Sequence, residues 1–230
     1  MALTPGHQAL IKISAVGTTT SFSNEACTAL GSNYKNYQIT SASKQIFDQG
    51  TTVTVETNNN GAGWVAAASN TVNYLFGIVT FATPLTSVYE VRVSGKYLPI
   101  LSVTGYARGL TWSENMSTMD ATCYSYAGTP ALQAGTFSVE GSFEFLSGLS
   151  FDLDSGGGTT KLITFLDDGT DAFLEVNPTP YESSASRGYV KFTKGAVDVP
   201  LKDLVKTTLT FQSNHRYSQS FGHYPSLTLA

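Results

Sequence analysis

Charged residues are scarce in this chain of 230 residues. Asp, Glu, Lys and Arg make up 13% of it, well below the usual quarter, so charge-rich disorder is excluded. The 13 basic and 17 acidic residues give a net charge of −4, which argues against a surface that neutralises nucleic-acid phosphates. The composition therefore gives no indication of specific DNA binding.

The chain also has only two cysteines and lacks long apolar runs. Cys27 and Cys123 lie far apart, with no CxxC pattern or adjacent His, so metal ligation by them is not indicated. Free thiols in a reducing compartment and a single long-range disulfide both remain open. No run approaches the roughly 18 to 20 apolar residues of a membrane span, and residues 1–6 lack a basic flank and an apolar core. We therefore expect no membrane segment and no export signal.

The residues that are abundant favour strands. The chain holds 25 serines, 30 threonines, 21 glycines, 12 tyrosines and 13 phenylalanines. Branched and aromatic side chains fit a pleated, half-buried surface better than a helix. A chain of this length suits one large β domain or two small ones.

Strands alternate with turn residues through the first part of the chain. Asn60 and Gly61 tolerate positive φ and predict a tight reversal toward Trp64. We expect one antiparallel strand to present Val88, Val91 and Val93 on a buried face. The predicted strands cover residues 9–13, 38–40, 52–57, 72–81 and 88–97.

Pro99 follows a long strand that a proline cannot continue, so we place a division near this residue. The first region, residues 1–99, is an additional β-rich region. The second, residues 100–230, is predicted to be an antiparallel β-sandwich or barrel. Its expected strands cover residues 103–112, 136–146, 172–176, 189–192, 196–200 and 207–211.

Residues 159–168 carry the strongest helix signal. Leu162, Ile163, Phe165 and Leu166 recur at helical spacing between a Thr cap and Gly169. The predicted fold class is therefore mainly β, an antiparallel sandwich or barrel with one short flanking α-helix.

Residues 113–135 separate two predicted strands by more than an ordinary loop length. This segment is either a hairpin extension or a working loop. It is poor in charge and carries side chains suited to an interface, namely Met116, Met119, Tyr124 and Tyr126.

No catalytic, cofactor or metal-binding set emerges from the sequence. The three histidines, His7, His215 and His223, lie in terminal segments, and no G-x-S-x-G elbow accompanies them. Residues 155–161 lack the Gly-Lys-Ser/Thr core of a phosphate loop. The clusters Asp152/Asp154 and Asp167/Asp168/Asp171 lack calcium-loop spacing, so we interpret them as solvated turn carboxylates. We expect a protein that is not an enzyme and has no cofactor.

The chain resembles the tail tube proteins of long-tailed, siphovirus-like bacteriophages in four motifs and in the order in which these motifs occur. The resemblance covers about residues 101–213. The motifs are Gly-Leu-Thr-Trp-Ser-Glu-Asn at 109–115 leading into a long loop, Gly-Ser-Phe-Glu at 141–144, the predicted helix at 159–168, and residues 199–206 leading into the last strand.

The resemblance implies a structural virion protein of the tail, assembled in the host cytoplasm. Tail tube proteins form six-membered rings that stack into a tube through which double-stranded DNA leaves the capsid. The implied partners are further copies of the chain, a tape measure protein and a tail terminator; DNA passes without tight binding, and no membrane is involved. The alternatives are a capsid decoration protein, a head–tail connector or an adhesin-type β-sandwich.

This function adds two expectations about individual residues. We expect residues 113–135 to stack successive rings. A DNA conduit also needs a wall that repels phosphate, because repeated cationic contacts would hold the DNA. The candidates for lumen-facing acids are Glu140, Glu144, Asp152 and Asp154.

Overall fold

The computed structural model describes residues 10–15, 17–99, 101–102, 107–120, 132–145, 152–154, 159–161, 169, 171–177, 185–198, 206–219 and 221–223. The fold is mainly β and every strand pair is antiparallel, as the sequence predicts. Within these residues the only helical element is a single 3-10 turn, η2 (Ala42–Lys44).

The first half of the chain forms a seven-stranded sheet, here called the N-terminal sheet. Its strands in spatial order are β5 (Trp64–Ala66), β4 (Thr54–Asn59), β8 (Tyr89–Tyr97), β2 (Thr20–Ala29), β3 (Asn36–Ile39), β7 (Ile78–Phe81) and β6 (Asn70–Asn73). The predicted reversal between β4 and β5 is confirmed, because Asn60 and Gly61 both adopt positive φ, 49° and 80°.

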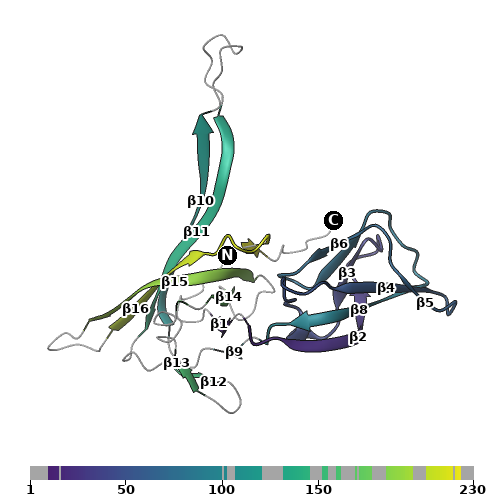
Figure 1. The fold of residues 1–230 in the computed structure, drawn as a ribbon, viewed down its shortest axis with the longest axis horizontal. Coiled ribbons are helices and arrows are strands. Elements are labelled where there is room, and N and C mark those ends of the chain that lie inside the picture. The colour runs from purple at the N-terminus through teal and green to yellow at the C-terminus, as the bar shows by residue number, and fades with distance from the viewer. Residues whose placement is uncertain are drawn as a thin grey trace, which may run out of the picture.

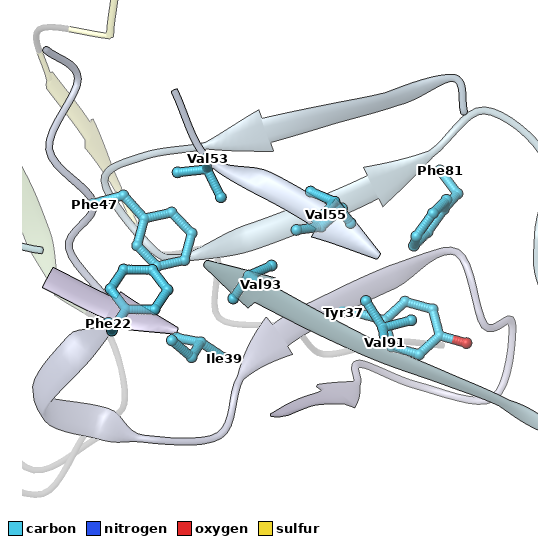
Figure 2. Close-up of a cluster of buried hydrophobic side chains, with 10 residues drawn as sticks. Phe22, Tyr37, Ile39, Phe47, Val53, Val55, Phe81, Val91 and Val93 are labelled. Carbon is cyan, nitrogen blue, oxygen red and sulfur yellow. The ribbon is translucent and has the colours of Figure 1, made fainter. Parts of the chain in front are cut away.

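This sheet curls around a core of aromatic and branched side chains (Figure 2). Phe22 stacks on Phe47 with ring centroids 5.4 Å apart. Val91 and Val93 of β8 are buried, as the alternation predicts. Val88 precedes the strand and is exposed, so its predicted place on the same face was wrong. Two residues of the same face must be separated by an even number of positions, and Val88 is three from Val91.

The run at 72–81 is two strands instead of one. Residues 74–77 turn the chain between β6 and β7, and Gly77 has a φ of +61°. A Cβ at Gly77 would lie 2.8 Å from the carbonyl oxygen of Gln45, so only glycine fits this turn without rearrangement.

The second sheet, here called the C-terminal sheet, has eight strands. Its order is β10 (Ala107–Asp120), β11 (Leu132–Phe145), β16 (Lys206–Ser213), β15 (Ser186–Asp198), β14 (Ala172–Asn177), β1 (Leu10–Ala15) and β9 (Leu101–Ser102), with β17 (Phe221–His223) paired to β15. Residues 189–192 and 196–198 belong to one strand, β15, whose register shifts between Phe192 and Lys194.

The N-terminal sheet is inserted between two neighbouring strands of the C-terminal sheet. Ile13 of β1 lies opposite Leu101 of β9, and all of β2 to β8 lies between them in the chain. β1 therefore belongs to the C-terminal sheet, although it precedes residue 99 in sequence.

The predicted helix at 159–168 is not confirmed. Residues 159–161 form β13 (Thr159–Lys161), which pairs with β12 (Asp152–Asp154), and residues 162–168 lie outside the described part. Thr159 and Thr160 are β-branched and favour extended backbone, and Lys161 lies opposite Asp152 in the register. The prediction thus fails for residues 159–161.

The two sheets are joined by a shared apolar cluster and by a pair of glutamines. Phe173 and Tyr189 of the C-terminal sheet pack with Leu75 and Phe76 from the turn after β6. The side chain of Gln219 bonds to the backbone of the N-terminal sheet, accepting from Tyr74 N at 2.7 Å and donating to Val72 O at 2.9 Å. Gln49 in turn bonds to the backbone of Gln219.

Candidate functional site

β10 and β11 form an arm that extends beyond the rest of the C-terminal sheet (Figure 1). β11 pairs with β16 only from Glu140 to Phe145, whereas it pairs with β10 from Leu132 onward. Residues 114–120 and 132–139 therefore form a two-stranded ribbon about 20 Å long at the rise of an antiparallel strand. The predicted segment 113–135 is thus a hairpin extension, with residues 121–131 outside the described part.

The base of the arm is fixed by aromatic packing. Phe143 stacks on Phe211 with ring centroids 4.9 Å apart and also contacts Phe192. Gly141 lies directly against this stack: a Cβ there would lie 2.2 Å from the carbonyl oxygen of Thr111 and 2.7 Å from Phe211. The glycine of the Gly-Ser-Phe-Glu motif is therefore required by close packing at the base.

The two faces of the arm differ in chemistry. Val139 and Phe143 lie on the face that is buried at the base, and the same face continues outward to Phe137 and its cross-strand partner Met116. Phe137 is half-buried, and Met116 is 59% exposed. Apolar side chains thus continue from the core onto the uncovered ribbon, on a face that also carries Glu114 opposite Val139.

The opposite face is polar and acidic. On β11 this face carries Glu140 and Glu144. On the neighbouring strand β10 it carries Thr111, Ser113 and Asn115. Glu140 is exposed and accepts a hydrogen bond from Asn115 Nδ2 at 3.3 Å. Residues 109–145 contain four acids and no Lys or Arg. This face therefore carries hydroxyl, amide and carboxylate groups, and the one basic residue of β10 and β11 is Arg108, at the base of the arm.

The other candidate residues divide between described and undescribed parts of the chain. Met119 lies on β10 near the end of the ribbon, and Asp152 and Asp154 lie on β12, away from the arm in sequence. Tyr124 and Tyr126 lie outside the described residues.

A polar link holds the arm at its base. Glu114 Oε1 lies 2.7 Å from His223 Nε2, and the other ring nitrogen of His223 lies 2.8 Å from Ser186 Oγ. His223 is on β17, which pairs with β15, so this contact joins the start of the ribbon to the centre of the sheet. The sequence alone gave no signal for it, because 109 positions separate the two residues.

A buried ion cluster lies beneath the junction of the sheets. Lys12, Glu175 and Arg187 are direct neighbours on three adjacent strands. Glu175 accepts from Lys12 Nζ at 2.8 Å and from Arg187 Nε at 2.6 Å, and Arg187 also donates to the carbonyl of Leu75 at 3.1 Å. Burial raises the pKa of Glu175, but Arg187 and Lys12 outweigh it and hold the pKa below its ordinary value of 4.5.

The two described histidines lie in hydrogen-bonded groups: His223 contacts both Ser186 and Glu114, and Ser186 is buried, with 6% of its surface exposed. His215 and His223 bond to different serines, Ser213 and Ser186. No cluster of three or more His, Cys, Asp or Glu side chains that could hold a metal ion occurs among the described residues. Cys27 is a free thiol, and burial, followed by the charge of Glu25, raises its pKa to about 12, so it stays protonated at neutral pH.

No protein family model and no curated protein matches this chain. Over the residues that the structure describes, no helix is long and apolar enough to cross a membrane.

Proposed function

We propose that the protein is a structural subunit of a phage tail, whose six-membered rings stack into a tube that conducts DNA. The observation that carries the proposal is the β10–β11 arm, with one face that carries Met116, Phe137 and Val139 beside Glu114, and an opposite face that carries Glu140 and Glu144. The site of action is then the virion tail, and the principal partner is a second copy of the chain.

The apolar face supports assembly. An isolated two-stranded ribbon is marginally stable in water, so an arm of this length gains stability from a neighbour. Met116 and Phe137 offer the surface that such a neighbour would cover. Burying apolar surface contributes roughly 25 cal/mol per Å², which a ring multiplies by the number of its subunits.

The exposed edge of the sheet supports ring formation. β10 lies at one end of the strand order and β9, with only two residues, at the other. Unpaired edge strands are templates for another chain, and closing a ring removes them.

The acidic face supports the conduit role. Glu140 and Glu144 lie on the side opposite the core, on a segment free of Lys and Arg. A wall of this charge repels phosphate and lets DNA slide. Asp152 and Asp154 remain further candidates for this wall.

Electron microscopy of the concentrated protein tests the assembly. We expect stacked rings from the wild type and folded, unassembled subunits after deletion of residues 116–129. Long tubes formed by the deletion variant would contradict a stacking role for the arm. Isolated trimers formed by the wild type would instead favour a decoration or adhesin protein.

A pair of point variants separates the arm from general surface hydrophobicity. Met116 and Val65 are similarly exposed, at 59% and 62%, but Val65 lies on β5 of the other sheet. We expect Met116→Asp to prevent tube formation and Val65→Asp to leave it intact. Equal effects of the two variants would assign assembly to a surface outside the arm.

A further inference from the structure

A cavity of about 390 Å³ opens at the end of the N-terminal sheet that carries β5. Aromatic side chains dominate its lining, namely Tyr34, Tyr37, Trp64 and Tyr89, and Cys27 and Glu90 also contribute to it. This volume is at the lower end of the range for small-molecule sites. It suits a ligand of one ring.

Tyr37 brings a polar group to this cavity that the described chain leaves unsatisfied. The side chain is only 2% exposed, and its hydroxyl has no hydrogen-bond partner. Figure 2 shows the hydroxyl pointing away from the other labelled side chains of the core. Burial, with a smaller contribution from Tyr34, raises the pKa of the phenol, so it remains protonated and able to donate. A buried unsatisfied hydroxyl is costly, and a ligand that bonds to it removes the cost.

Glu90 supplies a fixed acceptor at the same cavity. Its Oε2 accepts from Asn58 Nδ2 at 3.0 Å, and the buried Asn58 is held in turn by the backbone N–H of Gly63. A carboxylate held in this way disfavours anionic ligands and accepts hydrogen bonds from hydroxyl groups.

The surroundings of the cavity are unusually apolar for a surface. Three of the four exposed large hydrophobic residues found in the described chain are Trp64, Val65 and Val88. Trp64 lines the cavity, and the other two are adjacent in sequence to lining residues. Consecutive residues of a strand point to opposite faces, so Val65 faces away from Trp64, and the exposed apolar side chain that contributes to the cavity is Trp64 itself.

The indole of Trp64 already has a cation on one face. The guanidinium of Arg92 lies 4.2 Å from the ring centroid and is itself bound by Glu56 at 2.7 Å. Aromatic cages attract organic cations through the faces of their rings, and Arg92 already covers one face of Trp64 in this way. A neutral ligand with an apolar face and hydroxyl groups is the better fit.

We infer that this cavity binds a neutral sugar ring. Its aromatic walls pack against the apolar C–H face of the ring, and Tyr37 and Glu90 bond to its hydroxyl groups. The inference is independent of tube assembly, because the cavity lies in the N-terminal sheet and the arm lies in the other.

Titration of the purified protein with free monosaccharides tests the inference. Glucose, galactose, mannose, rhamnose, N-acetylglucosamine and N-acetylgalactosamine form the panel. Trp64 and Trp112 are the two tryptophans, so their indole N–H signals in nuclear magnetic resonance spectra report on the cavity and on a reference position. We expect at least one sugar to shift the Trp64 signal saturably, with a Kd on the order of 1 mM for a single ring.

Tyr37→Phe separates a binding role from a purely structural one. Because the hydroxyl has no partner among the described residues, its removal should leave the melting temperature unchanged or higher while weakening sugar binding at least tenfold. Tyr97→Phe is the matched control, since Tyr97 lines a different cavity, and it should bind as the wild type does. The inference would be overturned if no sugar bound or if Tyr37→Phe bound sugar as tightly as the wild type. It would also be overturned if tetramethylammonium bound and the sugars did not.

Discussion

At the scale of single residues, Glu175 connects three strands of the C-terminal sheet through its two oxygens. Lys12 lies 163 positions away in the chain and Arg187 lies 12 away, yet both donate to the same carboxylate. Arg187 also reaches Leu75 of the inserted sheet. The cluster therefore couples the folding of segments from both ends of the chain.

We expect Glu175→Gln to lower the free energy of unfolding by about 3–5 kcal/mol, because it leaves the buried guanidinium of Arg187 without its carboxylate partner. Glu56→Gln is the matched control. Glu56 pairs with Arg92 at 2.7 Å, but both side chains are about a quarter exposed, so the loss should be about 0–1 kcal/mol. Chemical denaturation at pH 7 measures both values. Equal losses would mean that burial does not strengthen the Glu175 cluster.

The same cluster predicts a pH dependence. The folded-state pKa of Glu175 is lowered, so its contribution to stability is complete above the ordinary value of 4.5 and is lost as the pH falls through the folded value. The stability difference between wild type and Glu175→Gln should therefore shrink below pH 4.5. Denaturation curves at pH 7 and pH 3 compare the two. A difference that does not change with pH would contradict the lowered pKa.

Gly141 offers a second prediction at this scale. An added Cβ would meet a backbone oxygen that cannot rotate away, so Gly141→Ala should destabilise the fold by about 1–3 kcal/mol. In Gly50→Ala the new methyl group would meet only the Asp48 carboxylate, at 3.3 Å, and the effect should be small. Thermal unfolding of the two variants makes the comparison. A Gly141→Ala protein as stable as the wild type would mean that the arm base adjusts freely.

At the scale of elements, the arm should behave differently in subunits and in tubes. Its ribbon has few packing partners within the described chain, and local opening is easiest where buried contacts are few. In unassembled subunits, amides of residues 114–120 should exchange with deuterium faster than those of residues 139–143. In assembled tubes, the exchange of the amides of residues 114–120 should be slower. Strong protection of the ribbon before assembly would argue that the arm needs no neighbour.

Elements defined by alternation and turn chemistry were predictable from the sequence. β8 follows from the spacing of Val91 and Val93, and the β4–β5 reversal follows from Asn60 and Gly61. The arm was foreseen only as one of two options, because its length was visible but the pairing of Met116 with Phe137 was not.

Other features depend on contacts that no local pattern encodes. The turn at 74–77 interrupts an apolar run, and only the close approach of Gln45 explains why Gly77 is needed. Residues 159–161 were predicted to begin a helix, but they form the strand β13 through pairing with β12. The unsatisfied Tyr37 hydroxyl and the Glu175 cluster arise from residues far apart in the chain, so periodicity could not reveal them.

At the scale of the whole molecule, the conduit role predicts weak interaction with DNA. Assembled tubes should show no measurable DNA binding at physiological salt, because the ribbon beyond Arg108 carries no Lys or Arg on residues 109–120 and 132–145. Glu140→Lys combined with Glu144→Lys should create binding that weakens as salt is added. Filter binding or fluorescence anisotropy with duplex DNA measures this.

The control reverses the charge of one acid away from the arm and is compared with Glu140→Lys alone, which changes the charge by the same amount. Glu25→Lys, on β2 of the N-terminal sheet, should add little DNA binding to tubes. Tight, salt-sensitive binding by the unmodified protein would contradict the conduit role, and equal binding by the Glu25→Lys variant would contradict the placement of the wall on the arm.

The insertion of one sheet between β1 and β9 also sets an order of events on the ribosome. β1 is synthesised first, but its partner β14 ends about 80 residues after β8, a delay of roughly 4–16 s at ordinary rates of translation. The N-terminal sheet can fold as soon as β8 has emerged. The sheet that carries the arm is completed only when β14, β15 and β16 follow, so a nascent chain acquires its rigid arm base late. Folding of the N-terminal sheet and readiness of the arm to assemble are thereby separated in time.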